Sequence, residues 1–363
     1  MANILLITHI SPPAVDGGSR VIVKMGEYLK KLGHQTLLIS SNCYSTDDFV
    51  RSTNKNTPGG LPVFTIFHKP FKLISKIFPI FGVFAKGPIF KFVPFFQLLV
   101  TSYQFHPDLI IAGPLPTTIV LYARFLKFVI RNCKLLINAS FHPTDPDFHN
   151  SLLINTLKTA NYVWTLTDHE TKLFNNSIKL GNGIDPSLLK TSPKNFPKIP
   201  TLLYIGTLAK HKNIESLVNE HQKLLLKFPN LRLIIAGQKS LYYPQLKKLL
   251  KLPNIKTIFG FSDKQLKTII DSSTIVVSPS TQESFGLTII EAWARKTPVI
   301  GQNIPATSEL ISNSLGGLIG LNNIEMLLRD QTLCQKLGQN GYNYVKANYL
   351  WPDIAKKLCQ NTL

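Results

Sequence analysis

Residues 278–297 read Ser-Pro-Ser-Thr-Gln-Glu-Ser-Phe-Gly-Leu-Thr-Ile-Ile-Glu-Ala-Trp-Ala-Arg-Lys-Thr. They follow residues 274–277, a short β-branched apolar run that predicts a buried strand. After Pro279 the chain is expected to turn, because proline cannot donate a hydrogen bond within a central sheet. The following residues predict a turn at Gly286 and a helix over residues 287–294. A strand, a glycine turn and a helix N-terminus together predict an anion-binding site, because the first amides of a helix lack internal acceptors.

Two carboxylates flank the start of this helix. Glu283 precedes the helix and Glu291 lies on it, eight residues later, so both side chains can face the anion site. Amides that hold phosphate, together with carboxylates that accept hydrogen bonds from hydroxyl groups, would suit a nucleotide-sugar. The alternative is that Glu283 is an ordinary loop carboxylate and Glu291 a solvated charge on the helix.

The pattern Glu-x-Phe-Gly-x(4)-Glu, followed by Thr-Pro-Val-Ile at residues 297–300, closely resembles the retaining glycosyltransferases of family 4. The resemblance implies the GT-B fold, an α/β architecture of two Rossmann-like, doubly wound parallel-sheet domains that face a central cleft. It also implies transfer of a sugar from a UDP- or GDP-linked donor with retention of anomeric configuration. In that family the first glutamate contacts the donor sugar and the second contacts the ribose, which gives Glu283 and Glu291 these expected roles.

Length and composition set the broad class of the protein. A chain of 363 residues is too long for one ordinary core and predicts two domains. The formal net charge of +20 favours an anionic partner or surface. The four cysteines show no metal-binding or redox spacing and are expected to be reduced thiols. Neither a leader peptide nor a run long enough to cross a bilayer is recognised, so we expect a cytoplasmic protein, peripheral on the inner face of the membrane.

Residues 4–39 predict a strand, a loop, a helix over residues 21–32 and a second strand, the opening of a parallel sheet. The loop lacks a Gly-x-Gly-x-x-Gly fingerprint, so no dinucleotide cofactor is expected. Pro-Pro-x(3)-Gly-Gly, followed by Leu-x-x-Leu-Gly-His, resembles the first unit of family 4 enzymes. The resemblance implies that Gly17 and Gly18 face the donor phosphates and the acceptor; the alternative is that they form only a wide turn.

Residues 63–105 hold half of the chain's 22 phenylalanines, interleaved with lysines, and contain no Asp or Glu. Their prolines are expected to divide them into short helical pieces, so they cannot form one spanning helix. Such a composition matches a membrane-interface surface, with rings at the acyl boundary and ammonium groups on anionic headgroups. The alternative is that the rings are core and the lysines its solvated face; no nucleic-acid motif is present. The candidate membrane or acceptor residues are Lys72, Lys76, Phe78, Phe81, Phe84, Lys86 and Lys91.

His142 lies just past a strand predicted over residues 134–139, where active-site residues collect in open α/β sheets. The resemblance implies that His142 contacts the donor sugar, although Pro143 stands where the family usually has an acidic residue. The Asp-Pro-Asp at residues 145–147 has a spacing that binds metal in other glycosyltransferases. We interpret it as a turn, and neither a metal nor another cofactor is expected.

Residues 201–205 predict the first strand of the second domain. The loop that follows, residues 206–212, resembles the donor-phosphate loop of family 4, with Thr207 in place of the usual arginine and Lys212 retained. A cation at this place would stabilise the charge that develops on the leaving diphosphate, unless Lys212 is an ordinary surface charge. The expected catalytic residues are Glu283, His142 and Lys212. The expected donor-binding residues are Gly17, Gly18, Gly206, Thr207, Lys212, Gly237, Phe261, Ser284, Phe285, Gly286, Leu287, Thr288 and Glu291.

Four segments are predicted: an acceptor-binding domain over residues 1–185, a proline-punctuated linker over 186–200, a nucleotide-sugar-binding domain over 201–345, and a terminal helix over 346–363 that crosses back to the first domain. Residues 305–309 predict a turn. The expected activity is hexosyl transfer to a lipid-linked or surface-glycan acceptor. Two alternatives stay open: a nucleotide-sugar epimerase on the same fold, and a non-catalytic partner subunit that binds nucleotide-sugar or membrane.

Overall fold

The computed structural model describes residues 1–9, 17–41, 57, 59–66, 92–115, 117, 119–141 and 151–363. The described chain forms two compact units. The first contains Met1–Asn182 and Trp351–Leu363, and the second contains Gly183–Leu350. Each unit is built around one sheet whose strands pair in parallel. The prediction of an α/β protein with two parallel-sheet domains is confirmed.

The first unit has a seven-stranded sheet in the order β3-β2-β1-β4-β5-β6-β7. Strand β1, between β2 and β4, is buried on both faces, since Ile4, Leu5, Leu6 and Ile7 are all inaccessible to solvent. Continuous apolar runs of this kind are what a parallel sheet covered on both sides requires. The strands are β1 (Asn3–Thr8), β2 (Gln35–Ser41), β3 (Val63–Ile66), β4 (Leu109–Ala112), β5 (Lys134–Asn138), β6 (Tyr162–Thr165) and β7 (Ser177–Lys179).

The helices of the first unit differ from prediction at two places. Gly17 and Gly18 form the first turn of a helix and do not lie in a loop. The prediction missed this turn because glycine is a poor helix former. Close packing nevertheless requires a glycine at position 18 of this helix, because a Cβ there would lie 2.4 Å from Cγ of Pro114. The helices are α1 (Gly17–Lys31), α4 (Phe92–Phe105), α5 (Ile119–Val129), α6 (Ser151–Thr159), α7 (Asp168–Thr171) and α15 (Trp351–Thr362).

The prediction of short helical pieces is wrong at the start of residues 63–105, and residues 67–91 lie outside the described part of the chain. Residues 63–66 form strand β3, parallel to β2, and residues 92–105 form the 14-residue helix α4. Pro94 does not break α4, because it lies in the first turn, where a backbone amide has no helical acceptor to lose. The prediction grouped residues 63–66 with the phenylalanine- and lysine-rich residues that follow them, and so it missed the strand.

The second unit has a six-stranded sheet in the order β10-β9-β8-β11-β12-β13. Its strands are β8 (Thr201–Leu208), β9 (Arg232–Lys239), β10 (Ile255–Phe259), β11 (Ile275–Ser278), β12 (Val299–Gly301) and β13 (Gly317–Ile319). Its helices are η3 (Pro186–Leu188), η4 (Lys210–Lys212), α8 (Ile214–Leu224), α9 (Tyr243–Leu246), η5 (Leu249–Lys251), α10 (Asp263–Asp271), α11 (Leu287–Ala294), α12 (Pro305–Ser314), η6 (Leu321–Asn323), α13 (Ile324–Arg329) and α14 (Gln331–Asn348).

The turn predicted at residues 305–309 is wrong, because these residues open helix α12. Pro305 occupies the first position of the helix, where its fixed φ angle suits helical geometry and its missing amide costs nothing.

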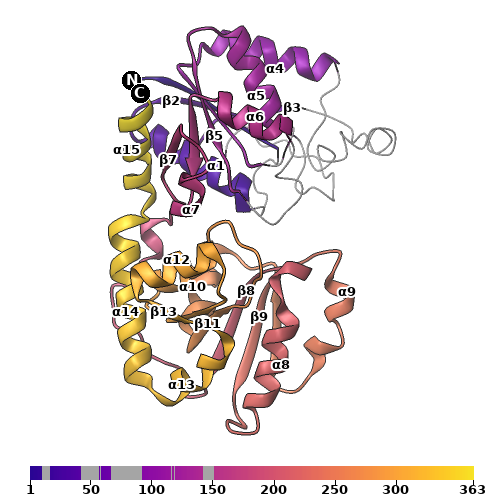
Figure 1. The fold of residues 1–363 in the computed structure, drawn as a ribbon, viewed down its shortest axis with the longest axis vertical. Helices are drawn as coiled ribbons and strands as arrows, with labels where there is room; N and C mark the ends of the chain where they lie inside the picture. The colour runs from indigo at the N-terminus through magenta and orange to yellow at the C-terminus, as the bar shows by residue number, and fades with distance from the viewer. Residues whose placement is uncertain are drawn as a thin grey trace. The chain divides into compact units, whose positions relative to one another are not determined.

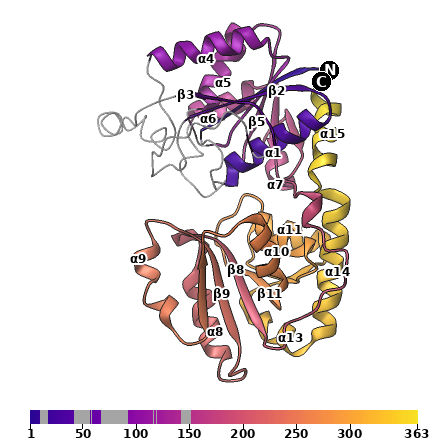
Figure 2. The same ribbon diagram turned by 180° about the vertical axis from the view of Figure 1, so that it is seen from behind.

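The last two helices belong to different units. Helix α14 packs along α11, α12 and α13 of the second unit (Figure 1). Helix α15 packs against α1 of the first unit, and both views show the two chain termini side by side at that end (Figure 2). The indole of Trp351 makes an edge contact with that of Trp164, with ring centroids 6.5 Å apart.

The expected linker, residues 186–200, falls within the second unit and is fastened there by a buried lysine. The ammonium group of Lys194 donates to the carbonyl oxygens of Ile270 (2.9 Å) and Asp271 (3.2 Å) and to the hydroxyl of Thr297 (2.9 Å). Burial lowers the pKa of Lys194 from 10.5 to about 7; the positive charges of Lys190 and Arg295 act in the same direction, and Asp271 opposes them. The segment is therefore held by a side chain that changes charge near neutral pH.

A second set of contacts fixes the same segment. The guanidinium of Arg295 pairs with the carboxylate of Asp271 and donates to the carbonyl oxygen of Leu188 at 3.0 Å. The ammonium of Lys190 lies 3.2 Å from the same carboxylate. The two cations lower the pKa of Asp271, although its burial acts in the opposite direction.

The folded protein should gain stability with pH through Lys194. Between about pH 7 and 10 the unfolded chain keeps the lysine proton and the folded chain releases it, so the free energy of unfolding should rise with pH. Relative to Lys194→Met, the wild-type value should rise by up to about 1.4 kcal/mol per pH unit in this window. Urea unfolding at pH 7, 8.5 and 10 measures it. Lys198→Met, at an exposed lysine of the same segment, is the control and should follow the wild type. Equal pH slopes for wild type and Lys194→Met would contradict the assignment.

Candidate functional site

The carboxyl ends of β8 and β11 form the point where the winding of the second sheet reverses. Strand β8 lies between β9 and β11. The chain continues from β8 to β9 on one side and from β11 to β12 on the other side, so it leaves β8 and β11 in opposite directions. In open α/β sheets such a reversal leaves a crevice at the carboxyl edge, and ligands bind there. The loops that follow β8 and β11 carry Lys212 and Glu283.

An ion pair joins these two loops. The ammonium of Lys212 lies 2.5 Å from a carboxylate oxygen of Glu283, and the two residues are 71 positions apart in sequence. Only 18% of the lysine side chain and 16% of the glutamate side chain are exposed. Two charges this far withdrawn from water need each other or a ligand, because an unpaired buried charge is costly.

Backbone contacts hold the two loops together beside the ion pair. Both the amide and the hydroxyl of Thr281, after β11, donate to the carbonyl oxygen of His211, after β8, at 2.9 and 3.1 Å. Asn213 then takes a left-handed conformation (φ 51°) at the junction between η4 and α8. The position of Lys212 is thus set by the short 3₁₀ turn η4. Hydrogen bonds from Thr281 fix this turn to the loop after β11, and Asn213 ends it.

Tyr204 lies beneath the pair and was not predicted as a site residue. Its hydroxyl donates to the carbonyl oxygen of Thr207 at 2.8 Å, and its ring is buried. Burial raises the pKa of Tyr204 well above 10, and the negative charge of Glu283 raises it further. The phenol therefore stays protonated and acts as a fixed donor. In the sequence Tyr204 reads only as one apolar residue of a buried strand.

Two predicted donor-binding glycines meet across the sheet. Gly206 and Gly237 are register partners in β8 and β9, and a Cβ on Gly237 would lie 1.7 Å from the carbonyl oxygen of Gly206. Gly206 has φ 150°, a conformation that side chains rarely adopt. The absence of side chains thus lets the two strand ends approach, which is a packing requirement in addition to any ligand contact.

Gly286 directly precedes α11 with φ 106° and has no side chain to cap the helix. The first amides of the helix, at Leu287 and Thr288, therefore point out of the helix start without an internal acceptor. Such amides and the positive end of the helix dipole favour an anion. Phe285 is buried, with its ring 5.2 Å from that of Tyr349, so only its backbone can reach a ligand. Glu291 lies further along α11 and is partly exposed, as is Ser284 in the preceding loop.

A basic aromatic cluster follows the neighbouring strands. The ammonium of Lys239, at the end of β9, lies 4.9 Å from the ring centroids of both Tyr243 and Phe259. The two rings contact each other edge to face at 5.7 Å. Phe261, a predicted donor-binding residue, follows two residues after Phe259 and is partly buried. Prediction missed Lys239 and Tyr243, which follow the predicted donor-binding residue Gly237 by two and six positions.

In the first unit, three polar side chains cluster at the carboxyl end of β1. The hydroxyl of Thr8 donates to that of Ser19 at 2.9 Å, and Nδ1 of the buried His9 lies 3.4 Å from the same oxygen. Gly17 and Gly18 precede Ser19 in the first turn of α1, and a Cβ on Gly17 would meet no atom within 4 Å. Prediction overlooked His9, although it follows its strand as His142 follows the strand at residues 134–139.

Several predicted residues lie outside the described part of the chain. They are His142 with the Asp-Pro-Asp at residues 145–147, and the membrane or acceptor candidates Lys72, Lys76, Phe78, Phe81, Phe84, Lys86 and Lys91. Where residues are described, no three His, Cys, Asp or Glu side chains come together in a group that could hold a metal ion. Likewise no helix among these residues is both long and apolar enough to cross a membrane.

The chain is similar to known glycosyltransferases. Residues 189–344 match the family model described as glycosyl transferases group 1. An uncharacterized glycosyltransferase of Methanocaldococcus jannaschii is 29% identical over 167 residues, which are 43% of this chain and 43% of the length of that relative.

Two solved structures have the same fold over nearly the whole chain. Sucrose-phosphate synthase of Thermosynechococcus elongatus is 18% identical, with a TM-score of 0.76 that covers 98% of this chain and 97% of the other. HepE of Anabaena, solved in complex with UDP and glucose, is 16% identical, with a TM-score of 0.74 over 99% of both chains. These likenesses confirm the GT-B fold.

Proposed function

Because residues 189–344 match the family model described as glycosyl transferases group 1, we propose that this protein is a retaining glycosyltransferase that uses a nucleotide diphosphate-sugar. The observation that carries the proposal is the Lys212–Glu283 ion pair at the point where the second sheet reverses. A cation, a carboxylate and the open amides of α11 meet there, and these groups suit a diphosphate that bears a sugar.

Donor binding exchanges the partner of Lys212. The diphosphate lies against the amides of Leu287 and Thr288 and takes the ammonium of Lys212 from Glu283. The released carboxylate then accepts hydrogen bonds from the hydroxyl groups of the sugar. Glu291, on the same helix, accepts bonds from the ribose. The glutamate thus becomes available to the sugar only when a phosphate has replaced it on the lysine.

Transfer breaks the bond between the anomeric carbon and the phosphate oxygen, and negative charge develops on the departing diphosphate. Lys212 and the helix amides stabilise this charge more strongly than in the ground state, which lowers the barrier. The acceptor hydroxyl attacks from the face that the phosphate leaves, and its proton passes to the departing phosphate oxygen. In this proposal no metal takes part, His142 orients the sugar, and Gly17 and Gly18 lie near the reacting centre.

At the phosphate loop this chain has one cation fewer than the family pattern, because Thr207 replaces an arginine. Its exposed side chain stands where the resembling enzymes have arginine, and its carbonyl oxygen is held by Tyr204. The proposal therefore assigns the charge of the diphosphate to Lys212 and to α11. Lys210 lies exposed in the same turn and is not assigned to the diphosphate.

The donor can be identified by thermal stability, since a ligand that binds only the native state raises the melting temperature. A panel of UDP, GDP and their sugars should include at least one stabilising nucleotide; UDP comes first, because the Anabaena structure holds it. Lys212→Ala should weaken binding of that nucleotide by about tenfold or more, since a charge-assisted hydrogen bond contributes about 1.5–3 kcal/mol.

Lys210→Ala removes an equal charge from the same turn and is the matched control. We expect it to change the dissociation constant by less than about threefold, a shift of the size that an exposed charge gives. If no nucleotide of the panel stabilises the protein, or if both alanine variants bind equally well, the proposed donor site is wrong.

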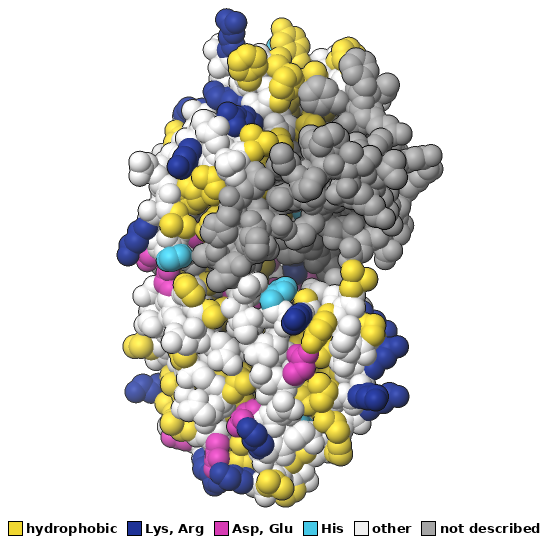
Figure 3. Space-filling view, turned by 45° about the vertical axis from the view of Figure 1, so that its right-hand side comes forward, with side chains coloured by type: hydrophobic (Ala, Val, Ile, Leu, Met, Phe, Trp, Pro, Cys, Tyr) yellow, Lys and Arg dark blue, Asp and Glu magenta, His cyan; other side chains and the backbone are white. Residues whose placement is uncertain are grey.

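We further propose that the first unit presents the acceptor at an anionic membrane surface. Aromatic side chains reach the surface of its described helices: Phe96 and Tyr103 of α4 are 58% and 62% exposed, and Phe128 of α5 is 81% exposed. Figure 3 shows hydrophobic side chains beside Lys and Arg on this unit. With a net charge of +20 and the phenylalanine-lysine composition of residues 63–105, this surface suits anionic headgroups and a lipid-linked acceptor.

Flotation with liposomes that contain an anionic phospholipid tests this second proposal. The protein should float at low ionic strength and much less at high salt, where charge attraction is screened. Phe96→Ser/Phe128→Ser should reduce the floated fraction at least about threefold, because two exposed rings leave the interface. Leu226→Ser/Leu241→Ser, at two exposed leucines of the second unit, is the control. Absence of flotation at low salt would contradict membrane association.

A further inference from the structure

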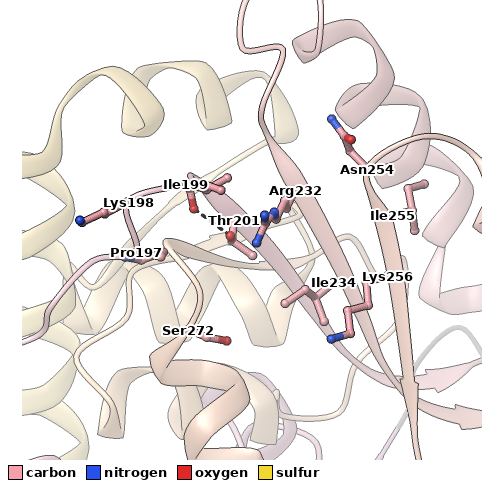
Figure 4. Close-up of a pocket in the computed structure, with 10 residues that line it drawn as sticks. All are labelled: Pro197, Lys198, Ile199, Thr201, Arg232, Ile234, Asn254, Ile255, Lys256 and Ser272. Carbon is pink, nitrogen blue, oxygen red and sulfur yellow. Dashed lines mark hydrogen bonds between the residues drawn. The ribbon is translucent and has the colours of Figure 1, made fainter.

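A pocket lies in the second unit at the edge of the sheet where the strands begin. Its volume is about 600 Å³, and the first residues of β8, β9 and β10 line it together with the segment before β8 and the end of α10. Figure 4 shows Arg232 in the middle of the lining, beside Thr201. Thr201 and Thr207 lie at opposite ends of β8, so this pocket is about 20 Å from the proposed donor site at a rise of about 3.3 Å per residue.

The charged side chains of the lining are all cations. They are Lys198, Arg232 and Lys256, and the described lining contains no carboxylate. Among the described residues none of the three has an ion-pair partner, whereas the nearby Asp271 is already paired with Arg295 and Lys190. Three unpaired cations around one concave surface produce a positive potential that attracts an anion.

The neutral polar groups of the lining are already satisfied. The hydroxyl of Thr201 donates to the carbonyl oxygen of Ile199 at 2.9 Å, and the hydroxyl of Ser272 donates to that of Ile269 at 2.8 Å. The amide of Asn254 donates to the carbonyl oxygen of Pro229 at 2.9 Å. The donors left for a ligand are therefore the guanidinium and ammonium groups and the second N–H of the Asn254 side chain.

The negative end of α10 points toward this edge but is already neutralised. Its last carbonyl oxygens, at Ile270 and Asp271, accept hydrogen bonds from Lys194. The helix terminus therefore opposes an anion in the pocket only weakly.

The remaining lining is apolar. Ile199, Ile234 and Ile255, with Pro197, cover the surface between the cations (Figure 4). A volume of about 600 Å³ lies in the range of small-molecule sites, which combine an apolar wall with a few placed polar groups. An inorganic anion alone would leave this wall without a partner.

We propose that this pocket binds a small organic phosphate, distinct from the sugar donor. The phosphate lies between Arg232 and Lys256, because the planar guanidinium gives two parallel donors and the ammonium a point charge. The apolar part of the ligand lies on the three isoleucines. Because both β8 and the segment before it line the pocket, an occupant contacts the strand whose other end carries the Lys212 turn. This proposal stands independently of the glycosyltransferase reaction.

Isothermal titration of the whole protein with phenyl phosphate, at constant ionic strength, tests the proposal. Phenyl phosphate should bind at one site and at least about threefold more tightly than inorganic phosphate, because its ring covers the apolar wall. Arg232→Gln/Lys256→Gln should weaken its binding at least tenfold. Lys336→Gln/Lys346→Gln removes the same charge from exposed positions of α14 and should not weaken it. Lys212→Ala should also leave it unchanged, which separates this pocket from the donor site.

Three results would overturn the proposal: no binding of phenyl phosphate, equal loss in the two double variants, or loss in Lys212→Ala. Vesicles that contain phosphatidic acid make a second arm, since a lipid headgroup carries the same phosphate chemistry. Binding to vesicles that depends on Arg232 and Lys256, without binding of phenyl phosphate, would assign the pocket to a membrane and exclude a soluble ligand. Unchanged circular dichroism of the double variants checks that they fold.

Discussion

The ion pair between Lys212 and Glu283 depends on the order of strands in the second sheet. Because β8 and β11 are neighbours, the loops that follow them meet although 71 residues separate the two charges. Each side chain is mostly withdrawn from water, so each needs a partner of opposite charge. A diphosphate can replace the carboxylate on the lysine, and sugar hydroxyls can replace the ammonium on the glutamate. The pair therefore holds the loops in place and keeps both groups ready for a ligand that satisfies both.

The surrounding residues make this exchange possible without rearranging the sheet. Tyr204 holds the carbonyl oxygen of Thr207 from below, and the glycines at 206 and 237 let the strand ends approach. Gly286 opens the start of α11, so its amides face the same edge as the carboxyl ends of the strands. The pocket around Arg232 lies at the opposite edge, where no group of the proposed reaction is found. The two proposed anion sites of this sheet thus differ in construction: the donor site combines Lys212 with the amides of α11, whereas the pocket offers side chains.

The sequence predicted those features that rest on local pattern. The bounds of α10 and α11 follow directly from periodicity and capping residues, and the buried strands follow from continuous apolar runs. Lys212 and Glu283 were each identified from a motif, but their contact was not, because it depends on which strands become neighbours. Strand β3 was missed because residues 63–66 were grouped with the phenylalanine-rich residues that follow them, and the first residues of α12 were interpreted as a turn although proline suits the first position of a helix. Arg232 and Lys256 belong to no motif, and only the register of β9 with β10 brings them to one pocket.

The most direct test of the account is a crystal structure with the nucleoside diphosphate that most stabilises the protein. We predict that the ammonium of Lys212 lies within about 3 Å of a phosphate oxygen, the usual length of a charge-assisted hydrogen bond. The carboxylate of Glu283 should have left the lysine, and the amides of Leu287 and Thr288 should point at the diphosphate. A diphosphate bound elsewhere, with the Lys212–Glu283 pair intact, would contradict the account.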